Sequence, residues 1–136
     1  MFTHQLDSEY ILRKKKSIKK QLLKKNCFIE KNIAIFGGST TSEIKYILEL
    51  FLLENGIKPK FYESEYNKFY EDALYGNEII NQFKPDIVYI HTTNKNIINF
   101  PEFNDSEDDI KLLLENEMER YKSVWAALSK FDCAII

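Results

Sequence analysis

The stretch from Asn32 to Gly56, NIAIFGGSTTSEIKYILELFLLENG, constrains the fold more than any other part of the chain. It begins with a short apolar run (33–36), continues through two glycines and a cluster of hydroxyl side chains (39–42), and passes directly into a helical pattern. The helical pattern places these apolar residues on one face: Ile44, Ile47, Leu48, Phe51 and Leu52. We therefore expect a strand, a tight turn and a helix, which together form the first half of a βαβ unit.

Both ends of this expected helix carry sequence signals. Thr40 is followed three residues later by Glu43, which is the spacing of a capping box. Gly56 is placed to end the helix in a left-handed turn. The turn before the helix lies where open α/β sheets place their chemistry, at the carboxyl end of a strand and beside a helix N-terminus.

Length and composition predict one globular domain. The 136 residues are 44% hydrophobic, so we expect a single domain over 1–136, with a basic N-terminal helix in 1–31 and an α/β core in 32–136. Cys27 and Cys133 lack metal-site spacing, and no signal-peptide pattern precedes them, so we expect a reduced cytoplasmic protein without a metal. No apolar run approaches the roughly 20 residues that span a bilayer, so no membrane contact is expected.

The N-terminal segment is strongly basic. Residues 1–31 carry nine Lys or Arg against three Asp or Glu, whereas the remaining residues carry ten against eighteen. Asp7 or Ser8 can cap a helix that runs to about Lys25. The helix either lies solvated across the domain, with its lysine stems covering apolar surface, or docks an acidic partner. Nucleic acid is not expected, because aromatic residues are not interleaved with the lysines and the rest of the chain is acidic.

The remaining chain repeats the strand-and-helix pattern. A short strand (57–62) precedes a helical segment (67–83) interrupted near Gly76, and a dense apolar run (87–90) predicts a parallel strand buried on both faces. Ser106 is placed to cap a long helix that reaches about Lys130. Its apolar stripe comprises Ile110, Leu113, Leu114, Met118, Tyr121, Val124, Trp125 and Leu128. Residues 133–136 begin a fourth strand, and a chain that ends there is expected to be a fragment, a trimmed chain or a divergent short gene product.

Four such units predict a three-layer α/β/α sandwich whose parallel sheet has the strand order 2-1-3-4, the order that begins flavodoxin-like sheets. This order brings the loop 38–40, after the first strand, beside the loop 91–96, after the third strand. We expect the two loops to face one crevice at the topological switch point of the sheet.

The segments IAIFGGSTTSEIKYILELFLLENGIKPKFYESEYNKFYEDAL and FKPDIVYIHTTNKNI resemble the N-terminal domain of FkbH-like proteins. In that family an SGNH-hydrolase-like domain precedes a haloacid-dehalogenase (HAD) type domain. The resemblance implies a role in loading a glyceryl unit onto an acyl carrier protein, in polyketide or surface-polysaccharide pathways. It also implies two partners, an acyl carrier protein and a HAD-type domain of the parent protein. The aspartate-rich motif of the HAD domain is not present in this chain.

The resemblance also implies catalytic positions. Ser39 lies where SGNH hydrolases carry the nucleophile of their Gly-Asp-Ser motif, although Gly38 replaces the Asp. Asn94 or Asn96 matches their oxyanion-hole asparagine, and His91 is the histidine near the expected crevice. The family's Asp-x-x-His block does not occur here, and a serine without a base is a weak nucleophile. His91 can equally be a strand-end histidine bonded to a loop carbonyl.

Three roles remain open for the loop after the first strand: a helix-capping turn, an anion or substrate site, and a true nucleophile at Ser39. The residues expected to bind substrate or anion are Gly37, Gly38, Ser39, Thr40, Thr41, Thr92, Thr93 and Asn96. No cofactor is expected.

Two functions follow from these observations. The first is a noncatalytic SGNH-like module that binds a substrate or an acyl carrier protein for an FkbH-like enzyme. The second is a serine-dependent esterase or acyltransferase that uses Ser39. For the first, the expected docking face for an acidic carrier protein is Lys15, Lys19 and Lys20.

Overall fold

The computed structural model describes residues 8–24, 27–76 and 78–136. Its four parallel strands have the order β2-β1-β3-β4, as the sequence predicts. The strands are β1 (Ile29–Gly37), β2 (Ile57–Glu63), β3 (Ile87–His91) and β4 (Ala134–Ile135). In the sheet register, Ile33 of β1 lies between Phe61 of β2 and Ile87 of β3. The carboxyl ends of the strands therefore meet at one edge of the sheet.

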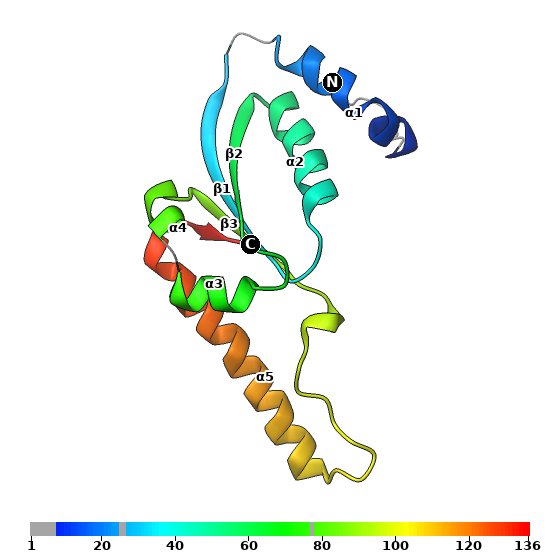
Figure 1. Ribbon diagram of the computed structural model, residues 1–136, viewed down its shortest axis with the longest axis vertical. Coiled ribbons are helices and arrows are strands. Elements are labelled where there is room, and N and C mark those ends of the chain that lie inside the picture. Colours follow the sequence, from blue (N-terminus) through cyan, green and yellow to red (C-terminus); the bar gives the residue numbers. More distant parts are fainter. Residues whose placement is uncertain (1–7, 25–26, 77) are drawn as a thin grey trace.

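The helices form a layer on each face of this sheet. They are α1 (Ser8–Leu22), α2 (Ser42–Glu54), α3 (Phe69–Tyr75), α4 (Glu78–Phe83) and α5 (Glu107–Leu128), with short 3₁₀ turns η1 (Asn94–Asn96) and η2 (Ser129–Phe131). Figure 1 shows α2 on one face of the sheet and α3, α4 and α5 on the other, with α1 against α2. The three-layer α/β/α sandwich is confirmed.

Two apolar cores hold the layers together. Side chains alternate along β1, so Ala34 and Phe36 are buried towards α3, α4 and α5, where Val88 joins them. The second core joins α1 to α2 and includes Ile11 and Leu50. The basic helix is thus a packed element whose apolar seam is buried and whose lysines lie outside.

Several boundaries differ from the sequence expectations. The first strand begins at Ile29 rather than near Ile33, because Ile29 to Asn32 pair with Ile57 to Lys60 of β2. β1 therefore starts inside the segment 1–31 that was expected to be helical, and α1 ends at Leu22. Two expected limits of that helix, Asp7 and Lys25, lie outside the described residues.

The capping box predicted for Thr40 and Glu43 is wrong. Thr41 is the N-cap residue of α2, and no side-chain hydrogen bond caps the helix. Glu43 lies 3.7 Å from the Nζ of Lys15 instead of reaching back along the chain. The C-terminal signal is confirmed: Gly56 has φ 78° and donates its N–H to the carbonyl of Leu53 at 3.1 Å.

The prediction that β3 is buried on both faces is also wrong. Only Val88 is fully buried, because the helices on the α3 side cover it. On the α2 side an apolar hollow of 350 Å³ remains, lined in part by Ile33, Ile87, Tyr89 and Ile136. α2 packs mainly against β2, and none of the described helices covers β3 and β4 on this side.

α5 begins as the sequence predicts, but much of its apolar stripe is exposed. Ser106 and Asp109 form a reciprocal capping box, in which each accepts a hydrogen bond from the other's main-chain N–H. Val124 and Leu128 are buried in the core. These stripe residues are 44–61% exposed: Ile110, Leu114, Met118 and Trp125. Ile110 and Leu114 lie in the first half of α5, which extends beyond the sheet beside the loop that follows η1 (Figure 1). Met118 and Trp125 lie in the second half, on a side of the helix that is not buried in the core.

Candidate functional site

The loops after β1, β2 and β3 are hydrogen-bonded to one another at the carboxyl edge of the sheet. The N–H of Gly38 donates to the carbonyl of His91 at 2.8 Å, and the N–H of Gly37 donates to Ser64 Oγ at 3.0 Å. The loop after β1, which carries Ser39, is therefore fixed to both of its neighbours. Any ligand that binds at this edge meets a largely preformed surface.

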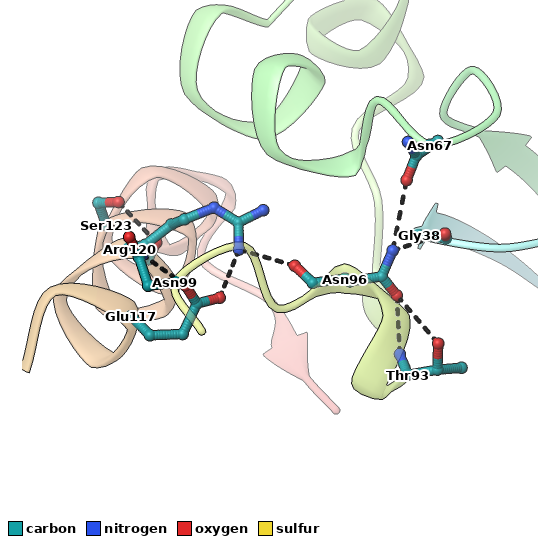
Figure 2. Close-up of polar contacts among 8 residues, drawn as sticks. All are labelled: Gly38, Asn67, Thr93, Asn96, Asn99, Glu117, Arg120 and Ser123. Atoms are coloured by element: carbon teal, nitrogen blue, oxygen red, sulfur yellow. Dashed lines mark hydrogen bonds and ion pairs between the residues drawn. The ribbon is translucent and has the colours of Figure 1, made fainter. Parts of the chain in front are cut away.

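Asn96 is the main link between the loops after β1 and β3. It is 5% exposed, and its Nδ2 donates to the carbonyl of Gly38 at 2.7 Å and to Asn67 Oδ1 at 3.3 Å. Its Oδ1 accepts the N–H of Thr93 at 2.8 Å (Figure 2). Both ends of this amide are thus engaged within the protein, and its expected role in binding a ligand remains a prediction.

Only a residue as small as glycine fits at position 38 beside the side chain of Asn96. A Cβ at this position would lie 2.5 Å from Cγ, Nδ2 and Oδ1 of Asn96, far inside van der Waals contact. The φ of Gly38 is not in the left-handed region, so the requirement is steric rather than conformational.

The hollow next to Ser39 does not lie where the sequence predicted a crevice, which was between the loops after β1 and β3. It has a volume of 220 Å³ and opens between the loops after β1 and β2, whereas Asn96 fills the contact between the loops after β1 and β3. From the first loop it is lined by the predicted residues Gly37, Ser39, Thr40 and Thr41. From the second loop it is lined by Glu63, Ser64 and Tyr66, which the sequence reasoning did not assign to the site. Their position at a parallel strand's carboxyl end is the signal that could have found them.

Glu63 sets the charge of this hollow. Its carboxylate accepts hydrogen bonds from Thr41 Oγ1 at 2.9 Å and from the Nζ of Lys45. The protein therefore places its own carboxylate beside the first turn of α2, where the main-chain amides favour negative charge. This carboxylate and its lysine partner leave the hollow with hydroxyl donors and little net charge.

In the described part of the chain no hydrogen bond joins Ser39 to His91. Over residues 8–24, 27–76 and 78–136, the hydroxyl of Ser39 makes no hydrogen bond. His91 Nδ1 lies 3.1 Å from the hydroxyl of Tyr89, not against the loop carbonyl that the sequence interpretation considered. In serine hydrolases a carboxylate holds this nitrogen and stabilises the charged imidazole, and a tyrosine hydroxyl supplies no such charge.

The other predicted residues of the loop after β3 lie around η1. Asn94 and Thr93 are exposed, and Thr92 is half-buried. Thr93 is the N-cap of η1, so its side chain and main chain both take part in the turn. Neither Asn94 nor these threonines line the hollow beside Ser39. An oxyanion-hole role for Asn94 stays a prediction.

A buried ion pair supports the loop after β3 from α5. Arg120 Nη1 donates to Glu117 Oε1 at 2.7 Å and to the carbonyl of Asn96 at 3.0 Å (Figure 2). Asn99 Nδ2 donates to the other oxygen of Glu117 at 2.8 Å. Burial by itself raises the pKa of Glu117, but the bonds from Asn99 and Arg120 outweigh it and hold the pKa below its ordinary value. The sequence reasoning missed this pair, although its i, i+3 spacing on a helix was a usable signal.

The predicted docking lysines on α1 are not equivalent. Lys19 pairs with Glu49 of α2 at 2.6 Å, and the Nζ of Lys15 and Lys19 lie 5.0 and 5.6 Å from the ring centroid of Tyr46. Lys20 is exposed. Two of the three lysines thus help to join α1 to α2, and docking of an acidic partner by this face remains a prediction.

The described residues show neither a metal-binding cluster nor a membrane-spanning helix. They contain no group of three or more His, Cys, Asp or Glu side chains that could hold a metal ion. None of the helices in this part of the chain is long and apolar enough to cross a membrane.

The fold and the loop geometry define an α/β sandwich whose candidate site lies at the carboxyl edge of a parallel sheet. The sequence matches no family model and no curated protein. The structure is similar to the crystal structure of the N-terminal part of the protein BF1531 from Bacteroides fragilis, described as containing a phosphatase domain and complexed with Mg. The TM-score is 0.62 at 14% identity, over 81% of this chain and 28% of that chain. This likeness shows the fold alone, and the chain spans less than a third of that structure's length.

Proposed function

We propose that this chain is the SGNH-like module of an FkbH-like protein, and that it binds a substrate or an acyl carrier protein instead of performing catalysis itself. The pathway would be glyceryl or acyl transfer in polyketide or surface-polysaccharide biosynthesis. Two observations support the family. The strand order is the one that the resemblance implies, and a similar fold occurs in a protein that also contains a phosphatase domain. An FkbH-like protein would pair this module with a HAD-type domain in the same way.

The surroundings of Ser39 are the observation that supports a module without catalytic activity. A serine nucleophile needs a base within hydrogen-bond reach and donors aimed at the developing oxyanion. Within the described residues, Ser39 has no hydrogen-bonded base, and the amide of Asn96 is engaged by Gly38, Asn67 and Thr93. The hollow beside Ser39 supports a binding role, since hydroxyl side chains and main-chain amides line a concave surface of fixed shape.

An acidic carrier protein fits the charge of α1. Residues 8–24 carry seven Lys or Arg and one Glu, and electrostatic complementarity mainly raises the association rate. Because Lys15 and Lys19 also hold α2, the cleanest variant reverses exposed lysines alone, as Lys16→Glu with Lys20→Glu. The matched control is Lys111→Glu in the first turns of α5, and the start of this helix lies far from α1 (Figure 1).

The test is stopped-flow binding of an acyl carrier protein from the same organism, measured over a salt series. We expect the double reversal to lower the on-rate by about tenfold at low salt, with little change in the off-rate, and the control to bind like the wild type. The on-rate of the wild-type chain should fall as salt rises, because exposed charges are screened over about 8–10 Å. If the on-rate were the same at every salt concentration and in the α1 double variant, the carrier-protein proposal would be wrong.

A further inference from the structure

A second hollow lies on the other side of Asn96, between the start of α3, η1 and the middle of α5. Its volume is 360 Å³, and its polar lining comprises Asn67, Glu71, Lys95, Asn96 and Arg120. It does not include Ser39 or any other residue of the loop after β1. This hollow is therefore separate from the hollow beside Ser39, which Asn96 does not line.

Arg120 offers unused hydrogen-bond donors to this second hollow. Its guanidinium carries five N–H donors, and its two hydrogen bonds, to the carbonyl of Asn96 and to Glu117, are both donated by Nη1. Among the described residues nothing accepts a bond from Nε or Nη2, yet these residues contain no fully buried polar side-chain atom without a partner. The unused nitrogens must therefore border accessible space. Figure 2 shows the second terminal nitrogen directed away from Glu117.

Aromatic rings hold the guanidinium in this position. Its central carbon lies 4.9 Å from the ring centroid of Tyr70, 5.5 Å from that of Phe69 and 5.6 Å from that of Tyr121. The side chain of Arg120 is 14% exposed. A guanidinium fixed in this way presents a planar fork that matches the oxygens of a carboxylate or phosphate, and it loses little entropy on binding.

Other groups around the hollow add donors. Asn67 uses its Oδ1 to accept a bond from Asn96, so its Nδ2 is left as a donor. Lys95 is exposed and has no acidic partner in the described part of the chain. Glu71 is the one carboxylate in the lining, and it is exposed.

We propose that this second hollow, built around the free edge of Arg120, binds a small oxyanion: a carboxylate or phosphate group on a compact polar molecule. Phe69, Tyr70 and Ile98 would cover the less polar part of such a ligand. This inference goes beyond the proposed function, which places ligand binding at the hollow beside Ser39. It predicts that the carboxylate of Glu71 opposes the binding of a plain anion.

The experiment titrates the chain with inorganic phosphate, and separately with acetate, at constant ionic strength, followed by amide and arginine Nε–H NMR. We expect either anion to shift signals of residues 67–71, 95–98 and Arg120 first. Lys95→Gln should weaken binding about threefold and Arg120→Lys about tenfold, since the second keeps the charge but loses the fork. Glu71→Gln should tighten binding about two- to threefold, because it removes a like charge.

Lys122→Gln, an exposed α5 variant outside the hollow, is the matched control and should bind like the wild type. Lys95 and Glu71 are exposed, so substituting them should not disturb the fold. Their variants therefore still test the proposal if Arg120→Lys alters the fold. Shifts confined to residues 37–41 would overturn this inference while supporting anion binding at the candidate site. Shifts confined to α1, no shifts with either anion, or unchanged affinity in Glu71→Gln and Lys95→Gln would also overturn it.

Discussion

Substitution of Gly38 by alanine tests the contact that joins the two loops at the carboxyl edge. The added methyl group would lie 2.5 Å from three atoms of Asn96, which is buried and bonded at both ends. Asn96 cannot turn away without breaking its hydrogen bonds to the Gly38 carbonyl and the Thr93 N–H. The φ of Gly38 is not in the left-handed region, so alanine adds no separate backbone strain.

The expected cost follows from these contacts. Inserting a methyl group into a tightly packed site costs about 1–3 kcal/mol. Losing two hydrogen bonds of a buried amide costs about 0.5–1.5 kcal/mol each. Because the clash is relieved by giving up those bonds, the two terms overlap, and we expect a loss of about 3 kcal/mol. For a domain of this length, that corresponds to a melting temperature lower by about 10 °C.

The assay is urea unfolding followed by circular dichroism, on a double-mutant cycle of Gly38→Ala and Asn96→Ala. Asn96→Ala loses the hydrogen bonds but makes room for the methyl group. The double variant should therefore be about as stable as Asn96→Ala alone, with a coupling energy of roughly 3 kcal/mol, the full cost of Gly38→Ala. Additive losses in the cycle, or a Gly38→Ala protein within about 0.5 kcal/mol of the wild type, would refute the steric argument.

Two further predictions concern ion pairs. The pKa of Glu117 is lower in the folded protein than in the unfolded chain, so its contribution to stability is present above the unfolded value of about 4.3 and is lost as pH falls through the lower folded value. Glu117→Gln should therefore destabilise the protein at neutral pH, and the difference in urea midpoint should shrink as the pH is lowered below about 4. Lys19→Glu should lower the free energy of unfolding by about 1 kcal/mol, since it sets two carboxylates together at Glu49, whereas Lys20→Glu should leave it nearly unchanged. Equal effects of the two lysine variants in thermal unfolding would contradict the observed α1–α2 pairing.

The sequence predicts the architecture well for a physical reason. Short apolar runs separated by helical patterns leave few topologies for a right-handed parallel sheet, and the order 2-1-3-4 is among them. Gly56 and Ser106 act as predicted because both turns depend on local backbone geometry. Such features are decided by residues that are neighbours in the chain.

The features that the sequence failed to predict depend on distant partners. Thr40 and Glu43 have the spacing of a capping box, yet Glu43 lies near Lys15 of α1. The bond from Asn96 to Gly38 joins residues 58 positions apart, so no local pattern reveals it. The same applies to the stripe on α5, whose burial depends on how far the sheet extends beneath the helix.

The hollow beside Ser39 also combines a part that local sequence predicts with a part that depends on distant contacts. Its loop was predicted, because hydroxyl residues follow an apolar run and precede a helix. Its other wall, Glu63 and Ser64, also follows from a strand's carboxyl end, but only the side-chain contacts show that the hollow opens towards the loop after β2 and not towards the loop after β3. The side chain of Asn96 fills the space between the loops after β1 and β3, where its Nδ2 donates to the carbonyl of Gly38.

The most direct test of the central claim is hydrolysis of a short activated ester, such as p-nitrophenyl acetate, by the wild-type chain and by Ser39→Ala. Ser39 has no base hydrogen-bonded to it in the described structure, and the nearby His91 is held by the hydroxyl of Tyr89. The two proteins should therefore show the same slow background rate and the same melting temperature. Turnover by the wild type that disappears in Ser39→Ala would contradict a noncatalytic module and establish Ser39 as a nucleophile.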